Sequence, residues 1–272
     1  MRVACLQTVP KPTIDDALEE AISLANEAEE SKVDFIFLPE YCGGLKSDGA
    51  LYRPPAAKEE HHIFLSKFKD FCKEKSVWCC LGSIAIDSDE DKIINRGFII
   101  DNSGHVVSRY DKIHMFDISL KGEEHKESDT VKPGNKAVIL KTKYGIIGHT
   151  ICYDLRFPSL YRELCQNGAQ ILLAPAAFTR KTGAAHWHIL NQCRAIENGA
   201  FVISPCAIGD IEGGGGSYGH SLIIDPWGQV IADGGDKRGV VIADIDIELV
   251  NKVRGQLPSL AHDRNFEVLK SE

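Results

Sequence analysis

Residues 144–167 read YGIIGHTICYDLRFPSLYRELCQN, and three signals follow one another in this stretch. The apolar run at 146–151 is typical of a buried strand. Pro158 suits the first turn of a helix, and Asn167 with the glycine that follows it suits the end of that helix. Cys152 therefore lies in a turn between a predicted strand and a predicted helix, at the edge where α/β sheets usually carry their chemistry.

The Cys152 thiol has two interpretations. Backbone N–H groups of the turn and nearby positive charge would favour the thiolate, which makes Cys152 a candidate nucleophile. A free cysteine that is simply buried as a small apolar side chain is the alternative. The surrounding residues, 150–154, lack the flanking glycines of the G-x-x-x-G nucleophile turn. The choice between the two depends on the rest of the chain.

The composition is ordinary for a globular protein. Of 272 residues, 43% are hydrophobic and 26% are charged, which fits one α/β domain spanning residues 1–272. The net charge of -8 argues against nucleic acid or an anionic membrane as a partner. No apolar run approaches the roughly 20 residues of a membrane span.

The cysteines and histidines give no sign of a metal site. Nine cysteines are present, and an odd number without a signal peptide predicts reduced thiols and a cytoplasmic protein. No C-x-x-C pair or His/Cys cluster has zinc spacing. His186 and His188 lie two residues apart on a predicted helix, so they do not share a face. No metal is predicted.

The elements of the two halves of the chain come in the same order: strand, helix, strand, helix, strand, hairpin. In the first half they are predicted at 3–7, 14–28 (capped by Thr13), 34–38, 63–72, 77–86 and 98–107. In the second half they are predicted at 146–151, 158–167, 171–174, 184–197, 201–204 and 222–231. A strand at 240–247 and a helix at 248–256 follow. The polar segment 121–136 is predicted as a loop whose length suggests a function.

Two pairs of segments indicate an internal repeat. FIIDNSGHVV at 98–107 is similar to LIIDPWGQVI at 222–231, and VDFIFLPE at 33–40 is similar to AQILLAPA at 169–176. Chance similarity between short apolar strands is the alternative. Two such halves predict an α/β fold in which two similar sheets pack face to face with helices outside, which is a four-layer αββα sandwich.

A cysteine nucleophile needs a base, an oxyanion stabiliser and a proton donor for the leaving group. Glu40 ends a buried strand, where it is either a solvated loop residue or a base. The matching position in the second half is Ala176, so the scaffold does not require an acid there. Lys112 ends the strand that begins at Val106, and Glu127 lies in the polar loop. Taken singly, each of these two would be read as an exposed charge.

Together these positions form a specific pattern. L-P-E at 38–40, Y-D-K-x-H at 110–114 and I-C-Y-D-L-R-F-P at 151–158 occur in that order. They resemble the nitrilase superfamily of carbon–nitrogen hydrolases, and the resemblance covers nearly the whole chain. P-A-A-F-T-x-x-T-G-A-A-H-W at 175–187, R-A-I-E-N at 194–198 and D-P-W-G at 225–228 resemble its Nit branch, which includes deaminated-glutathione amidases and ω-amidases. The sequence motifs within residues 179–197 are more similar to those of the deaminated-glutathione amidases than to those of the ω-amidases.

The resemblance implies roles residue by residue. Cys152 would be the nucleophile and Glu40 the general base. Lys112, with the backbone N–H of Tyr153, would stabilise the oxyanion, and Glu127 would orient Lys112 and the substrate amide. The family's fold is the αββα sandwich that the repeat also predicts, and its chemistry uses no metal or organic cofactor.

The substrates of this branch are small ω-amides of dicarboxylic or 2-oxo acids. A substrate carboxylate needs a cation, and Arg180 or Lys181 is a candidate, although solvated surface charges are an equal alternative. Tyr41, Phe116 and Phe178 are candidates to line the pocket.

The resemblance also implies supporting roles for other positions. Tyr153 and His114 are expected beside the substrate, His114 in a structural role, and Arg156 in a structural ion pair. His149 precedes Cys152 by three residues on one predicted strand and therefore faces the other side, which argues against a Cys–His pair. The family's pairing of helices predicts a homodimer through 158–167 and 184–197.

Several functions share such a site. The leading hypothesis is a cysteine-dependent amidase that releases ammonia through a thioester. A nitrilase, an N-carbamoyl hydrolase or an acyl transferase would use the same four residues. A binding protein that retains the fold without turnover is the alternative from outside the enzymes, and the presence of all four residues argues against it.

Overall fold

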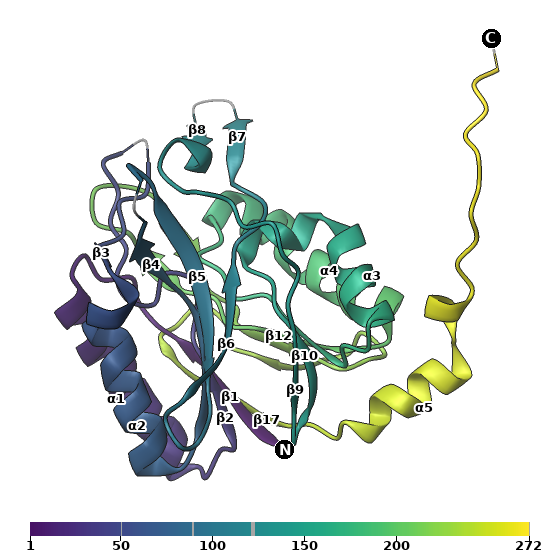
Figure 1. Cartoon of the computed structure of the whole chain (residues 1–272), viewed down its shortest axis with the longest axis horizontal. Helices are drawn as coiled ribbons and strands as arrows, with labels where there is room; N and C mark the ends of the chain where they lie inside the picture. The colour runs from purple at the N-terminus through teal and green to yellow at the C-terminus, as the bar shows by residue number, and fades with distance from the viewer. Residues whose placement is uncertain (50, 89, 121–122, 272) are drawn as a thin grey trace.

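Two β-sheets face each other, and helices cover the outer face of each sheet (Figure 1). The structure is a computed structural model, and it describes residues 1–49, 51–88, 90–120 and 123–271. The αββα sandwich expected from the repeat is confirmed by this layering.

The first sheet has the strand order β17-β1-β2-β4-β5-β6, and β3 pairs with β4. Its strands are β1 (Arg2–Gln7), β2 (Phe35–Phe37), β3 (Ala56–Ala57), β4 (Trp78–Asp87), β5 (Ile93–Ile100), β6 (Val106–Asp111) and β17 (Gly239–Asp244). Helices α1 (Ile14–Glu30) and α2 (Ile63–Lys75) cover its outer face, with the short 3-10 helix η1 (Glu59–His61) before α2.

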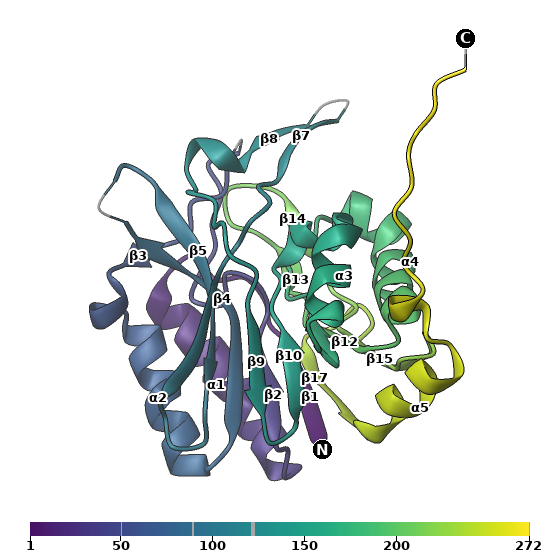
Figure 2. The ribbon, with the colours of Figure 1, turned by 45° about the vertical axis from the view of Figure 1, so that its right-hand side comes forward.

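The second sheet has the order β16-β15-β12-β11-β10-β9. Its strands are β9 (Ile139–Thr142), β10 (Gly145–Gly148), β11 (Ile171–Leu173), β12 (Phe201–Ser204), β15 (Leu222–Ile224) and β16 (Val230–Asp233). Helices α3 (Pro158–Gln166) and α4 (Arg180–Asn198) lie side by side over its outer face (Figure 2).

The remaining elements lie outside the two sheets. Two small hairpins pair β7 (Asp117–Leu120) with β8 (Glu123–Lys126) and β13 (Ile208–Asp210) with β14 (Gly216–Tyr218). Three short 3-10 helices are η2 (Glu127–Asp129), η3 (Cys152–Arg156) and η4 (Ser259–Ala261), and α5 (Glu248–Gln256) follows β17. Beyond η4 the chain extends away from the body of the protein (Figure 1).

The sheets repeat one topology. In the first, β1, β2 and β4 are parallel neighbours, and β5 and β6 continue the sheet in antiparallel fashion. In the second, β10, β11 and β12 are parallel and β15 and β16 are antiparallel. The similar segments at 98–107 and 222–231 form equivalent hairpins. The similarity between the segments therefore reflects a repeated unit rather than chance.

The inner faces of the sheets share one apolar core, because alternate residues of each strand point to the same side. Completely buried side chains from both sheets meet there, among them Val3, Phe35, Phe37, Ile147, Ile171, Phe201 and Ile223. Burial of each such side chain stabilises the fold by about 1.5 to 3 kcal/mol. The interface between the two sheets is therefore apolar and tightly packed.

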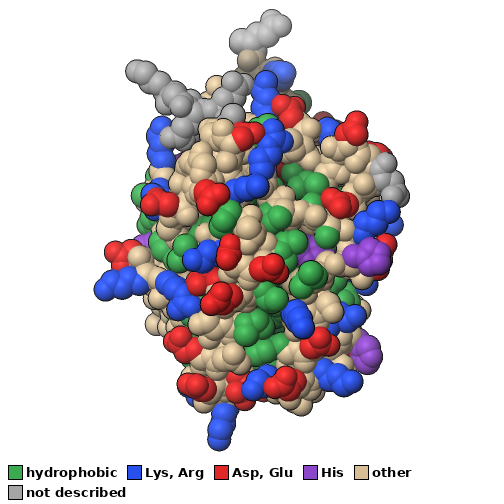
Figure 3. Space-filling view, turned by 90° about the vertical axis from the view of Figure 1, so that its left-hand side faces the viewer, with side chains coloured by type: hydrophobic (Ala, Val, Ile, Leu, Met, Phe, Trp, Pro, Cys, Tyr) green, Lys and Arg blue, Asp and Glu red, His purple; other side chains and the backbone are tan. Residues whose placement is uncertain are grey.

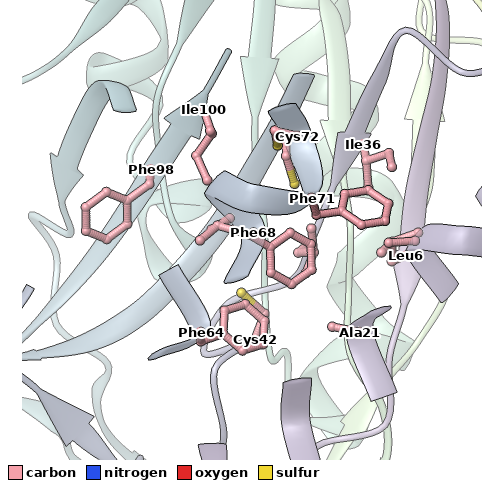
Figure 4. Packing of buried hydrophobic residues seen from close by; sticks show 14 of the residues in the cluster. Leu6, Ala21, Ile36, Cys42, Phe64, Phe68, Phe71, Cys72, Phe98 and Ile100 are labelled. Atoms are coloured by element: carbon pink, nitrogen blue, oxygen red, sulfur yellow. The ribbon is translucent and has the colours of Figure 1, made fainter. Parts of the chain in front are cut away.

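The outer face of the first sheet packs against an aromatic stripe on α2. Phe64, Phe68 and Phe71 follow helical spacing, so they project from one face toward the sheet (Figure 4). The rings of Phe64 and Phe68 stack with their centroids 4.8 Å apart. On α1 the predicted cap is present, since the Thr13 hydroxyl accepts a hydrogen bond of 3.2 Å from the Asp16 N–H.

Helix α4 begins at Arg180, four residues earlier than predicted. In the structure Gly183 lies inside the first turns, and a Cβ there would lie 2.4 Å from Cγ of Tyr218. The glycine is therefore needed for close packing and does not mark a helix end. Arg180 and Lys181, expected in a loop, are helical.

The predicted loop 121–136 also differs from the structure. Its residues 121 and 122 lie outside the described residues, but Glu123–Lys126 form β8 and Glu127–Asp129 form a 3-10 helix. Strand β8 pairs only with β7. The β8 residues are Glu, Glu, His and Lys, so this strand lacks the apolar alternation that strand prediction uses.

The surface view in Figure 3 shows acidic and basic side chains interspersed over the face on the left of Figure 1. No charge of one sign gathers on that face. Among the helices that the structure describes, none is both long enough and apolar enough to cross a bilayer.

Candidate active site

Four side chains distant in the sequence line one pocket. Glu40 follows β2, Lys112 follows β6, Cys152 follows β10, and Glu127 begins η2. Three of them thus come from the ends of strands in the two sheets, and the fourth comes from the segment that links the two halves. The sequence predicts these four together.

Glu40 is held by donors from both halves. Its carboxylate is only 4% exposed. Oε1 accepts hydrogen bonds from Asn95 Nδ2 at 3.0 Å and from Lys112 Nζ at 2.9 Å, and Oε2 accepts one from the Ala177 N–H at 3.0 Å. Ala177 follows the residue that matches Glu40 in the repeat, so the second half supplies a backbone donor where the first half supplies an acid.

Lys112 Nζ bridges the two carboxylates. It donates to Glu40 Oε1 at 2.9 Å and to Glu127 Oε2 at 2.8 Å, and its side chain is 2% exposed. Burial alone would lower the pKa of Lys112, but the charges of Glu127 and Glu40 outweigh burial and raise the pKa well above its usual range. Lys112 is therefore a permanent cation at neutral pH.

Glu127 is fixed by several donors besides Lys112. Its Oε2 accepts a hydrogen bond from the Phe116 N–H at 2.7 Å, and its Oε1 accepts one from the Tyr41 hydroxyl at 3.2 Å. Tyr41 itself has a left-handed backbone with φ of 52°, and its N–H donates to Ser83 Oγ at 2.9 Å. The turn after Glu40 thus directs the Tyr41 ring toward Glu127.

Cys152 lies in a strained turn. Its φ is 49°, a region that non-glycine residues rarely adopt. Its N–H donates to the Pro175 carbonyl oxygen at 2.8 Å, and the neighbouring Ile151 N–H donates to Asp154 Oδ2 at 2.8 Å. The strand β10 ends at Gly148, three residues before Ile151, so the chain turns sharply into η3 without the G-x-x-x-G pattern.

Asp154 holds this turn against the first half of the chain. It is fully buried. Besides the Ile151 N–H, it accepts hydrogen bonds from the Tyr110 hydroxyl at 2.7 Å and from the His114 N–H at 3.1 Å, and it lies 2.7 Å from His114 Nδ1. Tyr110, His114 and Lys112 belong to one segment, so Asp154 fixes the distance between the lysine and the cysteine.

Close approach at Gly82 brings the two halves together at the pocket. A Cβ there would lie 2.1 Å from the Leu38 carbonyl oxygen and 2.5 Å from Pro175 Cβ. Leu38 leads into Glu40, and Pro175 accepts the Cys152 N–H. Any larger residue at position 82 would separate the carboxylate from the thiol.

The protonation state of Cys152 corrects one expectation. Burial and the nearby Glu40 carboxylate raise its pKa well above the usual value, and the opposing charge of Lys112 does not overcome them. Positive charge beside the thiol therefore does not give a resting thiolate. A thiol in this state needs a base to remove its proton, and the Glu40 carboxylate lines the same pocket.

The predicted lining residues divide into two groups. Tyr41, Phe116, Tyr153 and Phe178 line the pocket. His114 does not; its ring stacks on Phe157 at a centroid distance of 3.5 Å and contacts Asp154. These contacts agree with the structural role expected for His114, and its ring is not among the side chains that line the pocket.

Arg180 lies outside the pocket as well. Its guanidinium pairs with Asp210 at 2.7 Å, and its side chain is 54% exposed. Lys112 is the one lysine or arginine that lines the pocket within the described residues. Arg156, expected in an ion pair, instead lies over the rings of Tyr153 and Phe178 at 5.8 and 5.4 Å. The Arg156 guanidinium therefore lies beside two of the rings that line the pocket.

Sequence reasoning missed several residues that line the pocket. Among them are Tyr52, His125, Thr179 and Thr182. The His125 ring lies 5.3 Å from that of Phe116 and 6.0 Å from that of Tyr52. Tyr52 is in a loop and His125 is in the polar hairpin, so no periodicity marks them. The two threonines lie in the T-x-x-T pattern, which was noted only as a family signal.

His149 does not take part. It is buried away from the pocket lining, and burial lowers its pKa to about 4. A Cys–His pair is thus not formed by this residue. A metal ion also does not suit the pocket, because the Lys112 ammonium already occupies the position between the two carboxylates where a cation would bind.

The comparisons with known proteins agree with this geometry. The carbon-nitrogen hydrolase family profile matches residues 2–255. The chain is 37% identical to a deaminated glutathione amidase of Dictyostelium discoideum, over 93% of this chain and 91% of that protein. It is 33% identical to the omega-amidase NIT2 of Mus musculus, over 97% of this chain and 95% of that protein.

A solved structure shows the same fold. The C. elegans NitFhit protein superposes with a TM-score of 0.87 at 29% identity, and the match covers 97% of this chain. This chain spans 65% of the length of the worm protein. The pocket lined by Glu40, Lys112 and Cys152 therefore lies in an αββα sandwich that this solved structure shares.

The chain belongs to the carbon-nitrogen hydrolase family, within the Nit branch of the nitrilase superfamily. It is a hydrolase of carbon–nitrogen bonds other than peptide bonds. The resemblance seen in the sequence motifs is thereby confirmed.

Proposed function

We propose that this enzyme is a cysteine-dependent amidase that hydrolyses a small carboxylate-bearing amide through a thioester. One observation carries the proposal: Lys112 Nζ bridges Glu40 and Glu127 within hydrogen-bond distance in the pocket that Cys152 also lines. A base, a fixed cation and a nucleophile around one small space are the requirements of acyl transfer to a thiol.

Acylation begins with proton transfer. Glu40 takes the thiol proton as the Cys152 sulfur attacks the amide carbonyl carbon, which avoids a buried thiolate in the resting enzyme. Negative charge develops on the carbonyl oxygen. The Lys112 ammonium and the Tyr153 N–H stabilise it, and the described residues offer no other acceptor to that N–H.

Collapse of the tetrahedral intermediate breaks the C–N bond. Glu40 returns the proton to the leaving nitrogen, so a primary amide releases ammonia and a secondary amide releases an amine. Water then attacks the thioester while Glu40 accepts its proton, and the acid departs as the thiol is restored. Glu127 stays a carboxylate that orients Lys112 and the amide nitrogen throughout.

The names of the relatives suggest the substrate class. Deaminated glutathione and ω-amides both carry a carboxylate away from the scissile amide. Arg180 and Lys181 were candidates to bind that carboxylate, and Arg180 is paired with Asp210 outside the pocket. His125 lines the pocket and is a further candidate to contact the substrate's polar end.

A substrate panel tests the proposal. Deaminated glutathione, 2-oxoglutaramate, a matched nitrile and a matched N-carbamoyl acid are compared by kcat/KM, with ammonia or the new amine measured. We expect an amide to exceed the nitrile and the carbamoyl acid by at least about 100-fold. Intact-mass analysis should show an acyl adduct on Cys152. A preference for the nitrile or the carbamoyl acid would contradict the proposal, as would formation of an amide with an added amine in place of the acid.

We further propose a homodimer that buries an apolar patch on α4. The patch consists of Ile189 and Ile196, which are 63% and 50% exposed, and Trp227, which is 63% exposed. Ile189 and Ile196 lie two turns apart on one face of α4, and the turn that carries Trp227 packs on Ile196. Adjacent exposed apolar side chains of this size commonly mark an interface.

Ile189→Glu should convert the dimer to a monomer. In a two-fold interface each substitution is present twice, and each buried carboxylate loses hydration. We expect the dimer dissociation constant to rise at least about 100-fold, measured by sedimentation equilibrium. Ile63→Glu is the matched control, because Ile63 is 52% exposed on α2, on the other outer layer. If Ile189→Glu changes the dimer dissociation constant no more than Ile63→Glu does, the interface lies elsewhere.

A cytoplasmic location is also proposed. All nine cysteines are free, and eight of them are buried. Reduced thiols in such number suit a reducing compartment. The proposed chemistry agrees, because an oxidised Cys152 could not attack an amide.

A further inference from the structure

Three potential metal ligands converge at a site separate from the Cys152 pocket. His188 lies on α4, His220 follows β14, and Asp233 ends β16. One ligand atom from each residue lies within 4.8 Å of the others. None of the three lines the catalytic pocket. Spacing along the sequence suggests only His186 and His188 as a possible metal-binding pair. The neighbours of His188 in this cluster lie 32 and 45 positions away along the chain.

The distances fit a coordination polyhedron. His188 Nε2 lies 3.0 Å from Asp233 Oδ2, and His220 Nδ1 lies 2.9 Å from Asp233 Oδ1. A tetrahedral zinc ion with ligands at about 2.0–2.1 Å has ligand atoms about 3.3 Å apart. Small rotations of three side chains would bring them to that spacing.

The backbone of His220 is fixed in an unusual conformation. Its φ is 52°, which costs free energy for a residue with a Cβ. The His220 N–H donates to the Gly235 carbonyl at 2.8 Å, and its own carbonyl accepts from Trp187 Nε1 at 2.7 Å. These bonds hold the imidazole over Asp233 rather than toward solvent.

The rings and the carboxylate are also oriented by their neighbours. The Tyr218 ring stacks on His220 with centroids 4.7 Å apart and meets His188 edge-on at 6.4 Å. The Gly235 N–H donates to Asp233 Oδ1 at 2.8 Å. Support of this kind around a ligand set reduces the ordering needed when an ion binds.

The site is half-open to solvent. The side chains of His188, His220 and Asp233 are 33%, 26% and 34% exposed. An ion can therefore enter without unfolding, and water can complete its coordination. Two imidazoles with one carboxylate favour Zn²⁺ and similar transition metals over Mg²⁺ or Ca²⁺, which prefer oxygen ligands.

We propose that His188 Nε2, His220 Nδ1 and the Asp233 carboxylate bind one divalent transition metal ion, with Zn²⁺ as the best fit. Each ligand nitrogen must give up its proton, which moves to the other ring nitrogen or to solvent. The ion links α4, the segment after β14 and the end of β16. Its function is to hold these three elements together, independently of the reaction at Cys152.

The test uses the full chain after treatment with a chelator and dialysis. Zn²⁺ and Co²⁺ are titrated calorimetrically into the wild type, His220→Asn, Asp233→Asn and the control His186→Ala. Asn tolerates positive φ, so His220→Asn removes the ligand with little added strain. Asp233→Asn keeps size and acceptor capacity. Circular dichroism checks that each variant is folded.

We expect one Zn²⁺ per chain in the wild type and in His186→Ala, and at least about 100-fold weaker binding in His220→Asn and Asp233→Asn. The spectrum of bound Co²⁺ should lack a thiolate charge-transfer band, which excludes the cysteines as ligands. The proposal is overturned if the wild type takes up no Zn²⁺, if both variants bind as tightly as the wild type, or if the Co²⁺ spectrum shows thiolate ligation. In those cases the three residues are a hydrogen-bonded cluster only.

Discussion

Turnover by the Cys152→Ala variant should fall by at least about 10⁴-fold, to the limit of detection, while the fold is retained. No other described thiol lines the pocket, so none can replace the sulfur. Alanine adopts the left-handed φ of 49° about as well as cysteine does, so the turn should persist. Steady-state release of ammonia from the best amide and a thermal unfolding curve measure the two quantities.

Cys193→Ser is the matched control for this experiment. Cys193 is the exposed member of the nine cysteines and lies on α4 away from the pocket. Its kcat/KM should stay within about two-fold of the wild type, because the pocket is unaffected. Activity retained by Cys152→Ala would remove the thioester mechanism even if the pocket still bound the amide.

The fold followed from local patterns because it is built from a repeated unit. The strand–turn–helix order at 144–167 and the two similar hairpins carry enough apolar periodicity to define both sheets. Glu40, Lys112 and Cys152 follow strands that such patterns detect, so their approximate positions were accessible. Their mutual distances were not, since these depend on Gly82 and Asp154, whose contacts cross from one half to the other.

The features that could not be predicted from the sequence depend on tertiary contacts between polar or small residues. The start of α4 at Arg180 was not predicted, and the close packing of Gly183 against Tyr218, 35 positions further along the chain, is not visible in the local pattern. His125 lies on β8, a strand without apolar residues, so no pattern in the sequence indicated that it lines the pocket. The raised pKa of the Cys152 thiol depends on its burial beside Glu40. Charge counting along the chain cannot supply that information.

The Lys112→Met variant should lose at least about 10³-fold in kcat/KM and also lose stability. Methionine fills the space but leaves two buried carboxylates without their cation, which typically costs 3–5 kcal/mol. In the wild type the pKa of Lys112 is raised by its partners. Its stabilising charge is therefore complete below the pKa of an unfolded lysine, about 10.4, and is lost only as pH rises through the higher folded value. The stability deficit of the variant should accordingly be constant from about pH 7 to pH 9.

A double variant separates the two effects of Lys112. In Lys112→Met/Glu127→Gln one buried charge is removed with the cation, and the new amide oxygen can still accept the Phe116 N–H that Glu127 Oε2 accepts in the wild type. Denaturant unfolding should show that part of the lost stability returns, whereas kcat/KM stays at the level of Lys112→Met. Recovery of activity together with stability would mean that Lys112 only holds the carboxylates in position. If activity fails to recover while the protein regains stability, restored packing and charge balance are not sufficient for turnover, which is the result expected if Lys112 and Glu127 act on the substrate directly.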